Sequence, residues 1–230
     1  MENKKLSNGY EINYIKDSYN NELVALIING TTQCISFTDN RKFLLYDQYS
    51  FFYDTPNIID NSSIYNTLVL GGGTMSYPKY YISKYNNKYM DVIEISNDLI
   101  NASYTYFYLN DLYTQFDPER RRLSIINDDC IHYIDFTNKK YDYIFFDAYL
   151  GYDIVPAIYE YATIRKIKSK LNPNGYLGIN YVVTNENKYI QLKDALMNNF
   201  DYYKEYSLPN APEYKYILVS DKEIKSEDVI

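Results

Sequence analysis

Leu68-Val69-Leu70-Gly71-Gly72-Gly73-Thr74 has the pattern of a short apolar strand that runs straight into a turn of three glycines. Later apolar runs are followed by acidic residues, namely Glu94, Asp129 and Asp147. In an open parallel α/β sheet, ligands lie beyond the carboxyl ends of the strands. A glycine turn and three carboxylates at that edge predict a site that can hold a nucleoside.

From residue 67 onward, short apolar runs alternate with stretches of helical pattern, which is typical of βαβ units. Asn172-Pro173-Asn174-Gly175 is a strong turn signal before the fifth run. The last two apolar runs, Tyr202–Tyr206 and Tyr214–Val219, are expected to pair as an antiparallel edge. We expect parallel strands at 67–70, 90–94, 123–127, 141–147 and 175–180, and helices at about 77–86, 97–108, 129–135, 156–170 and 187–199.

The first 60 residues are β-rich. Residues 23–28 and 31–37 flank Asn29-Gly30, the two-residue signal of a type I′ hairpin, and Tyr10–Ile15 is expected to add a third strand. The sequence therefore predicts a small N-terminal β-domain at residues 1–60 and a nucleoside-binding catalytic domain at residues 61–230.

Composition narrows the possible partners. The net charge of −7 argues against a nucleic-acid backbone as the main partner, because phosphate contacts need clustered Lys and Arg. Cys34, Cys130 and the single histidine, His132, do not supply the four ligands of a structural metal site, so no metal is expected. No apolar run reaches the 18 or so residues of a membrane span, and residues 1–5 open no signal sequence, so we expect a cytoplasmic protein without membrane contact.

The glycine turn by itself has two explanations. Glycines let a backbone approach a ligand closely, and the start of the next helix offers free N–H groups. Gly71 and Gly73 fit the first and third positions of the dinucleotide fingerprint, but Ser76 stands at the sixth. A tight strand-to-helix turn explains the motif equally well, and a dinucleotide-dependent oxidoreductase stays an outside alternative.

Each acidic residue has a functional and a structural interpretation. Glu94 is placed to accept hydrogen bonds from ribose hydroxyls, or to cap a turn. Asp129 is placed to accept from an adenine amino group, with Asp128 capping the next helix. Asp147 follows four apolar residues, where burial raises the pKa of a carboxyl toward the range of a general base; it could instead orient a cationic amine or bind loop amides.

These motifs resemble those of the spermidine synthase family of aminopropyltransferases and its spermidine-synthase-like relatives. The resemblance runs from the hairpin near residue 23 to the turn near residue 175. The family's motifs, in chain order, are Asp-Gly-x-x-Gln, Tyr-His-Glu, Gly-Gly-Gly-Asp-Gly, Val-Glu-Ile-Asp and Gly-Asp-Ala. Their counterparts here are Asn29-Gly30-Thr31-Thr32-Gln33, Tyr46-Asp47-Gln48, Gly71-Gly72-Gly73-Thr74-Met75, Ile93-Glu94-Ile95-Ser96 and Asp128-Asp129-Cys130.

The resemblance implies a Rossmann-like methyltransferase fold with a mainly parallel seven-stranded sheet behind a small β-domain, and pairing of two chains as a homodimer. It also implies that decarboxylated or intact S-adenosylmethionine is the co-substrate and that Asp147 binds and deprotonates the attacking small amine. Tyr46 and Tyr149 are expected to contact that amine. The residues expected to hold the donor are Gln33, Gly71, Gly72, Gly73, Glu94 and Asp129.

Two departures lie on the amine side of the expected site. The family's catalytic loop, Asp-x-x-Asp, is Asp147-Ala148-Tyr149-Leu150, so its second acid is replaced by Leu150. The acid of the glycine turn, which in the family contacts the aminopropyl amine, is Thr74. The nucleoside half of the site is kept, whereas the amine half has lost two carboxylates.

Three functions fit this asymmetry. We favour aminopropyl transfer in polyamine biosynthesis, with amine contacts supplied from elsewhere, for instance by Asp153 or Glu160. The alternative is methyl transfer from intact S-adenosylmethionine to a small molecule, because Thr74 would not repel the donor's carboxylate as an acid would. The third is a nucleoside-binding protein without catalysis. Methylation of nucleic-acid bases is disfavoured, because the loop after the fourth strand lacks an Asn/Asp-Pro-Pro-Tyr/Phe motif.

Overall fold

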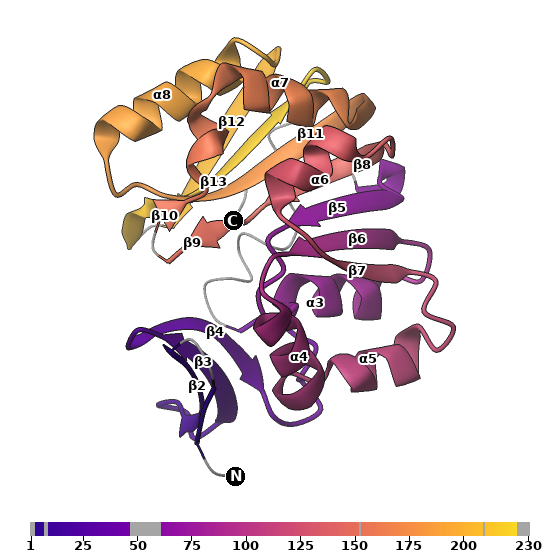
Figure 1. Cartoon of the computed structure of the whole chain (residues 1–230), viewed down its shortest axis with the longest axis vertical. Coiled ribbons are helices and arrows are strands. Elements are labelled where there is room, and N and C mark those ends of the chain that lie inside the picture. Colours follow the sequence, from indigo (N-terminus) through magenta and orange to yellow (C-terminus); the bar gives the residue numbers. More distant parts are fainter. Residues whose placement is uncertain (1–2, 7–8, 47–60, 152, 209, 225–230) are drawn as a thin grey trace.

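The computed structural model describes residues 3–6, 9–46, 61–151, 153–208 and 210–224. Two sheets organise these residues, a small N-terminal sheet and a large one that carries most of the helices (Figure 1). The predicted domain boundary at residues 60 and 61 falls at the edge of residues 47–60, which lie outside the described part, and it stays a prediction. In the described part, no helix combines the length and the apolar character that crossing a membrane requires.

The N-terminal sheet is antiparallel and four-stranded. Asn29 and Gly30 both have positive φ, 51° and 79°, as a type I′ turn requires, so the predicted hairpin is confirmed. The strands follow their sequence order: β1 (Lys4–Lys5), β2 (Tyr10–Lys16), β3 (Glu22–Ile28) and β4 (Thr31–Phe37).

The large sheet has seven strands in the order β12-β13-β11-β8-β5-β6-β7. The pairs β5·β6, β6·β7, β5·β8 and β8·β11 are parallel, and β13 runs antiparallel between β11 and β12. The predicted mainly parallel sheet with an antiparallel edge is therefore confirmed. Its strands are β5 (Asn66–Leu70), β6 (Tyr89–Glu94), β7 (Leu123–Asn127), β8 (Tyr141–Phe146), β11 (Leu171–Val182), β12 (Tyr202–Leu208) and β13 (Ala211–Ser220).

Alternation along each strand divides the core between the two faces of this sheet. In β5, Val69 packs with α3 and α5 on one face, while Leu68 and Leu70 pack with α6, α7 and α8 on the other (Figure 1). The helices are α3 (Ser76–Lys84), α4 (Asn97–Tyr106), α5 (Leu109–Phe116), α6 (Cys130–Phe136), α7 (Tyr161–Ser169) and α8 (Glu186–Met197), with short 3-10 turns η2 (Asn61–Ser63) and η3 (Pro156–Tyr159).

A third cluster joins the two sheets. Ile12, Val24 and Leu26 of the N-terminal sheet pack against Leu99 of α4 and against Phe107, which follows it. This apolar contact places β4 beside the turn after β5. Residues from both sheets therefore line one cavity.

The largest differences from the predicted elements are at four places. The helix expected at 97–108 ends at Tyr106, and Tyr108, with φ of 62°, is the N-cap of the unpredicted α5. The helix expected at 156–170 is split into η3 and α7, because Glu160 between them is extended. The turn at 172–175 lies within β11 as a bulge, where the register with β8 shifts. A short hairpin, β9 (Tyr149–Leu150) with β10 (Asp153–Ile154), was not predicted.

Candidate active site

A cavity of about 510 Å³ lies at the carboxyl ends of β5, β6 and β8, between the two sheets. After β5 the chain continues through β6 and β7 on one side of β5, and it then returns to β8 on the other side. The strand order therefore reverses at β5, and open α/β sheets bind ligands at such a topological switch point. The cavity collects the predicted base, the predicted donor-binding residues and the two predicted amine-contacting tyrosines: Gln33, Tyr46, Gly71, Gly72, Gly73, Glu94, Asp129, Asp147 and Tyr149.

The glycine turn is shaped by two different requirements. Gly71 has φ of +96°, and a Cβ built on it would stand 2.3 Å from the carbonyl oxygen of Asp147. Gly73 has φ of +50°, but a Cβ there would meet nothing within 4 Å. Gly71 therefore permits the close approach of the chain after β8, whereas Gly73 serves the turn's conformation and leaves open space above it.

Glu94 holds the glycine turn in place. Its Oε2 accepts the backbone N–H groups of Gly72 and Gly73 at 3.0 and 2.8 Å, and its Oε1 accepts that of Ser96 at 2.8 Å. Burial raises the pKa of Glu94, against the effect of these amide hydrogen bonds. A carboxylate has about four acceptor positions, so Oε1 retains capacity for a hydroxyl donor such as a ribose. The two interpretations of Glu94 are thus compatible.

The residue that caps α6 differs from the prediction. Asp129, not Asp128, is the N-cap of α6: its Oδ1 accepts the N–H groups of Ile131 and His132 at 2.8 and 2.9 Å. Asp128 instead accepts the N–H of Asp129 and contacts the ring of His132 at 2.9 Å. Because the cap uses Oδ1, Oδ2 of Asp129 has no hydrogen-bond partner among the described residues and can accept from a ligand.

Asp147 follows β8 and is oriented by a residue that the sequence did not single out. The side-chain amide of Asn180, in β11, donates to Oδ1 of Asp147 at 2.9 Å. The hydroxyl of Tyr149 donates to the carbonyl oxygen of Asn180 at 2.9 Å. Burial raises the pKa of Tyr149, and the charge of Asp147 adds to this effect, so Tyr149 stays neutral.

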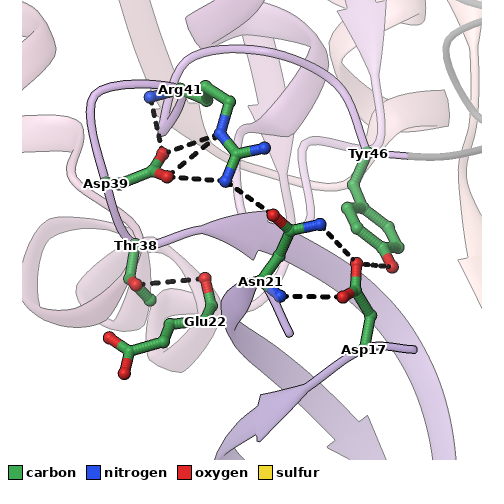
Figure 2. Close-up of polar contacts among 7 residues, drawn as sticks. All are labelled: Asp17, Asn21, Glu22, Thr38, Asp39, Arg41 and Tyr46. Atoms are coloured by element: carbon green, nitrogen blue, oxygen red, sulfur yellow. Dashed lines mark hydrogen bonds and ion pairs between the residues drawn. The ribbon is translucent and has the colours of Figure 1, made fainter. Parts of the chain in front are cut away.

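The N-terminal sheet closes the cavity from the other side. On β4, Cys34 Sγ contacts the hydroxyls of Thr74 and Ser76, which belong to the turn and to the start of α3. Tyr46 donates its hydroxyl proton to Asp17 at 3.0 Å (Figure 2). The residues that follow Tyr46 in its motif, Asp47 and Gln48, lie outside the described part of the chain.

A polar network fixes the segment that carries Tyr46 (Figure 2). Asp17 also accepts from Asn21, and Asn21 accepts from Arg41 at 2.9 Å. Arg41 in turn pairs with Asp39. Because its hydroxyl belongs to this network, Tyr46 contributes a wall to the cavity rather than a free proton donor. Within the described residues, no three His, Cys, Asp or Glu side chains are placed to hold a metal ion.

The family model of the spermine/spermidine synthase domain matches residues 56–226, about three quarters of the chain. The chain belongs to the spermine/spermidine synthase family. It is therefore a transferase, as the sequence motifs indicated. The match spans the glycine turn, Glu94, Asp129 and Asp147, and leaves the whole N-terminal sheet outside.

Solved structures show the same fold. A probable spermidine synthase from Corynebacterium glutamicum aligns over 95% of this chain and 80% of its own, with 19% identity and a TM-score of 0.77. Spermidine synthase from Thermotoga maritima aligns over 96% and 72%, with 14% identity and a TM-score of 0.67. Human methyltransferase-like protein 13, in complex with SAH, aligns over 77% and 79%, with 19% identity and a TM-score of 0.61.

At these identities the structural matches show the fold alone, the Rossmann-like methyltransferase fold that the sequence predicted. No sequence among the curated proteins matches the chain.

Proposed function

We propose that this member of the spermidine synthase family binds an adenosyl sulfonium compound in the cavity and transfers an alkyl group from its sulfur to a small amine. One observation carries the proposal: Asp147 lines the same cavity as the glycine turn and Glu94, and it is held by Asn180. The part of the cavity that suits the nucleoside, at Glu94 and the glycine turn, is therefore adjacent to the part that suits the amine, at Asp147.

The donor's nucleoside has suitable partners in the proposed pose. Oε1 of Glu94 and Oδ2 of Asp129 accept from the ribose hydroxyls and the adenine amino group, respectively. The backbone of Gly71, Gly72 and Gly73 lies against the nucleoside because no side chain intervenes. Gln33, Tyr46 and Tyr149 form walls around the reacting groups.

The reaction is a displacement at a carbon attached to the sulfonium. The lone pair of the amine forms the new N–C bond, the C–S bond breaks, and its electron pair leaves with sulfur as a neutral thioether. Asp147 orients the amine and accepts its proton. Because the leaving group needs no proton, alignment of the two reactants contributes most of the rate, and Asp147 adds general-base help.

Membership of the family favours aminopropyl transfer from decarboxylated S-adenosylmethionine, as in polyamine synthesis. Methyl transfer from the intact donor is a second candidate, favoured by the absence of an acid at Thr74. Asp153 and Glu160, which the sequence suggested as replacements for the missing acids, are not among the residues that line the cavity. Pairing of two chains through the N-terminal sheet is a further prediction, which light scattering tests.

The test is to incubate the purified protein with each donor and a panel of small amines, and to identify the nucleoside product by mass spectrometry. Methylthioadenosine as product marks transfer of the three-carbon chain, and S-adenosylhomocysteine marks methyl transfer. Asp147→Asn is the matched control. Binding of methylthioadenosine without any turnover would reduce the protein to a nucleoside binder, and a thermal shift with NAD alone would overturn the donor assignment.

A further inference from the structure

Three neutral side chains stand together beside the glycine turn. Sγ of Cys34 contacts Oγ1 of Thr74 and lies 2.9 Å from Oγ of Ser76, and the two hydroxyls are 3.3 Å apart. All three residues line the cavity, and Thr74 is only 2% exposed. We call them the neutral cluster.

A buried positive charge stands behind the neutral cluster. Lys79 follows Ser76 by three residues in α3, is 1% exposed, and donates from its amine to the carbonyl oxygen of Phe107. Burial lowers the pKa of Lys79 to about 8, against a smaller opposing effect of Cys34, so the amine is mainly charged at pH 7. Residues three apart on a helix share a face, so Lys79 lies one turn from Ser76 on the same side of α3.

The described acids of the cavity make their hydrogen bonds away from Lys79, and Asp128 pairs with His132. Glu94 binds the glycine turn, Asp129 caps α6, and Asp147 accepts from Asn180. No described carboxylate bonds to Lys79 or to the neutral cluster. An ammonium group beside the cluster would therefore lie near a like charge without a partner, whereas a carboxylate would find hydroxyl donors and a favourable field.

A sulfonium has three carbon substituents, and the cavity offers a direction for each. Glu94 and Asp129 lie on the β6 and β7 side and suit the nucleoside, whereas Asp147, after β8, suits the reacting carbon in the proposed pose. The neutral cluster is a further polar surface of the cavity, beside the glycine turn, and it suits the third substituent, the tail of the donor.

We propose that Cys34, Thr74 and Ser76, with Lys79 behind them, bind the carboxylate of an amino-acid tail, so that the preferred donor is intact S-adenosylmethionine. This inference rests on the proposed function, because it specifies the donor of the same site. Within that function, it favours intact S-adenosylmethionine over the decarboxylated compound as the donor.

Three unreactive thioethers test the inference by calorimetry. Methylthioadenosine lacks the tail, S-adenosylhomocysteine carries the complete tail, and its decarboxylated analogue lacks only the carboxylate. We expect S-adenosylhomocysteine to bind at least about tenfold more tightly than the decarboxylated analogue, the effect of one charge-assisted hydrogen bond. Thr74→Asp should reverse that preference, because it places a negative charge in the cluster.

The contribution of the buried charge is measured with Lys79→Met. This variant should shrink the preference to threefold or less while methylthioadenosine binding changes little. Lys88→Met is the matched control: Lys88 is also buried, at 8% exposed, and bonds to the carbonyl oxygens of Asn61 and Ile64, but it does not line the cavity. If Lys79→Met is too unstable, Thr74→Val removes a hydroxyl at similar volume and should weaken S-adenosylhomocysteine selectively.

The outcomes separate the inference from the function beneath it. If methylthioadenosine does not bind, the proposed function fails. If methylthioadenosine binds but the decarboxylated analogue binds as well as S-adenosylhomocysteine or better, the proposed function stands and the carboxylate assignment is wrong. A preference for S-adenosylhomocysteine that persists in both Lys79→Met and Thr74→Val would also overturn the assignment to these residues.

Discussion

The side-chain amide of Asn180 donates a hydrogen bond of 2.9 Å to Oδ1 of Asp147 and thereby ties β11 to the end of β8. The parallel register pairs Ile179 with Phe146, so the next residue of each strand lies at the cavity. The carbonyl oxygen of Asn180 also accepts from Tyr149. One residue of β11 therefore positions both the proposed base and a wall of the amine half.

Asn180→Ala should lower kcat about tenfold and leave the affinity for methylthioadenosine within twofold, because a misplaced base slows alignment but not nucleoside binding. Asp147→Asn should cost more, about 10²–10⁴-fold in kcat, since it removes the base itself. Asn199→Ala is the matched control, because Asn199 donates only within α8 and its loop and does not line the cavity. Steady-state kinetics and calorimetry check this; an equal loss of nucleoside affinity would make Asn180 structural.

Glu94→Ala should weaken methylthioadenosine binding about ten- to a hundredfold, because a hydrogen bond to a charged acceptor contributes about 1.5–3 kcal/mol. It should also lower the melting temperature, since the N–H groups of Gly72 and Gly73 lose their acceptor. Calorimetry and a melting curve measure the two effects. A variant that melts earlier but binds methylthioadenosine normally would restrict Glu94 to the turn.

The same residue predicts a pH dependence. Burial raises the pKa of Glu94 above its ordinary value of 4.5, so protonation begins at a higher pH than for a free glutamate. The protonated form accepts hydrogen bonds poorly, and nucleoside affinity should therefore fall as the pH falls through that raised pKa. Calorimetry with methylthioadenosine between pH 7 and pH 5 tests this, and a flat profile would contradict it.

Local patterns were sufficient for the sheet and for part of the site. Alternating apolar runs and helical stretches predicted the parallel strands, and Asn29-Gly30 predicted a hairpin whose two φ values are both positive. Glu94, Asp129 and Asp147 were found because acids at strand ends converge in this fold. Even so, the cap of α6 was assigned to Asp128 although Asp129 makes it, because a cap depends on where the helix begins, and this boundary is uncertain by a residue or two in sequence.

Contacts between distant elements could not be predicted. The N-cap of α5, Tyr108, adopts a left-handed φ of 62° without being Gly or Asn, so no local signal predicted the start of this helix. Asn180 lies inside a long strand and has no motif of its own. The neutral cluster and Lys79 come together only because β4 packs beside the turn and the start of α3, which is a consequence of tertiary packing.

Gly71→Ala should destabilise the protein more than Gly73→Ala does, because only Gly71 lies against the backbone of Asp147. Gly73→Ala forces a left-handed alanine into open space and should cost about 1–2 kcal/mol of unfolding free energy. Gly71→Ala adds a clash with the Asp147 backbone, so it should cost more and also lower transfer activity. Urea denaturation and kinetics of the two variants check this. Equal losses of unfolding free energy would mean that the backbone after β8 can shift away from the new side chain at no cost in stability.

Met75 stands where the resemblance places a glycine, and it adopts φ of 61° although its side chain is fully buried. Met75→Ala should lose about 2–5 kcal/mol through the cavity that it leaves. Met75→Gly leaves a similar cavity but relieves the left-handed strain, so it should be about 1 kcal/mol more stable than Met75→Ala.

Met90, buried within β6, has no positive φ and serves as the control. There the order should be opposite, with Met90→Gly about 0.5–1 kcal/mol less stable than Met90→Ala. Denaturant unfolding of the four variants measures both differences, and the same order at the two sites would show that Met75 stores no backbone strain.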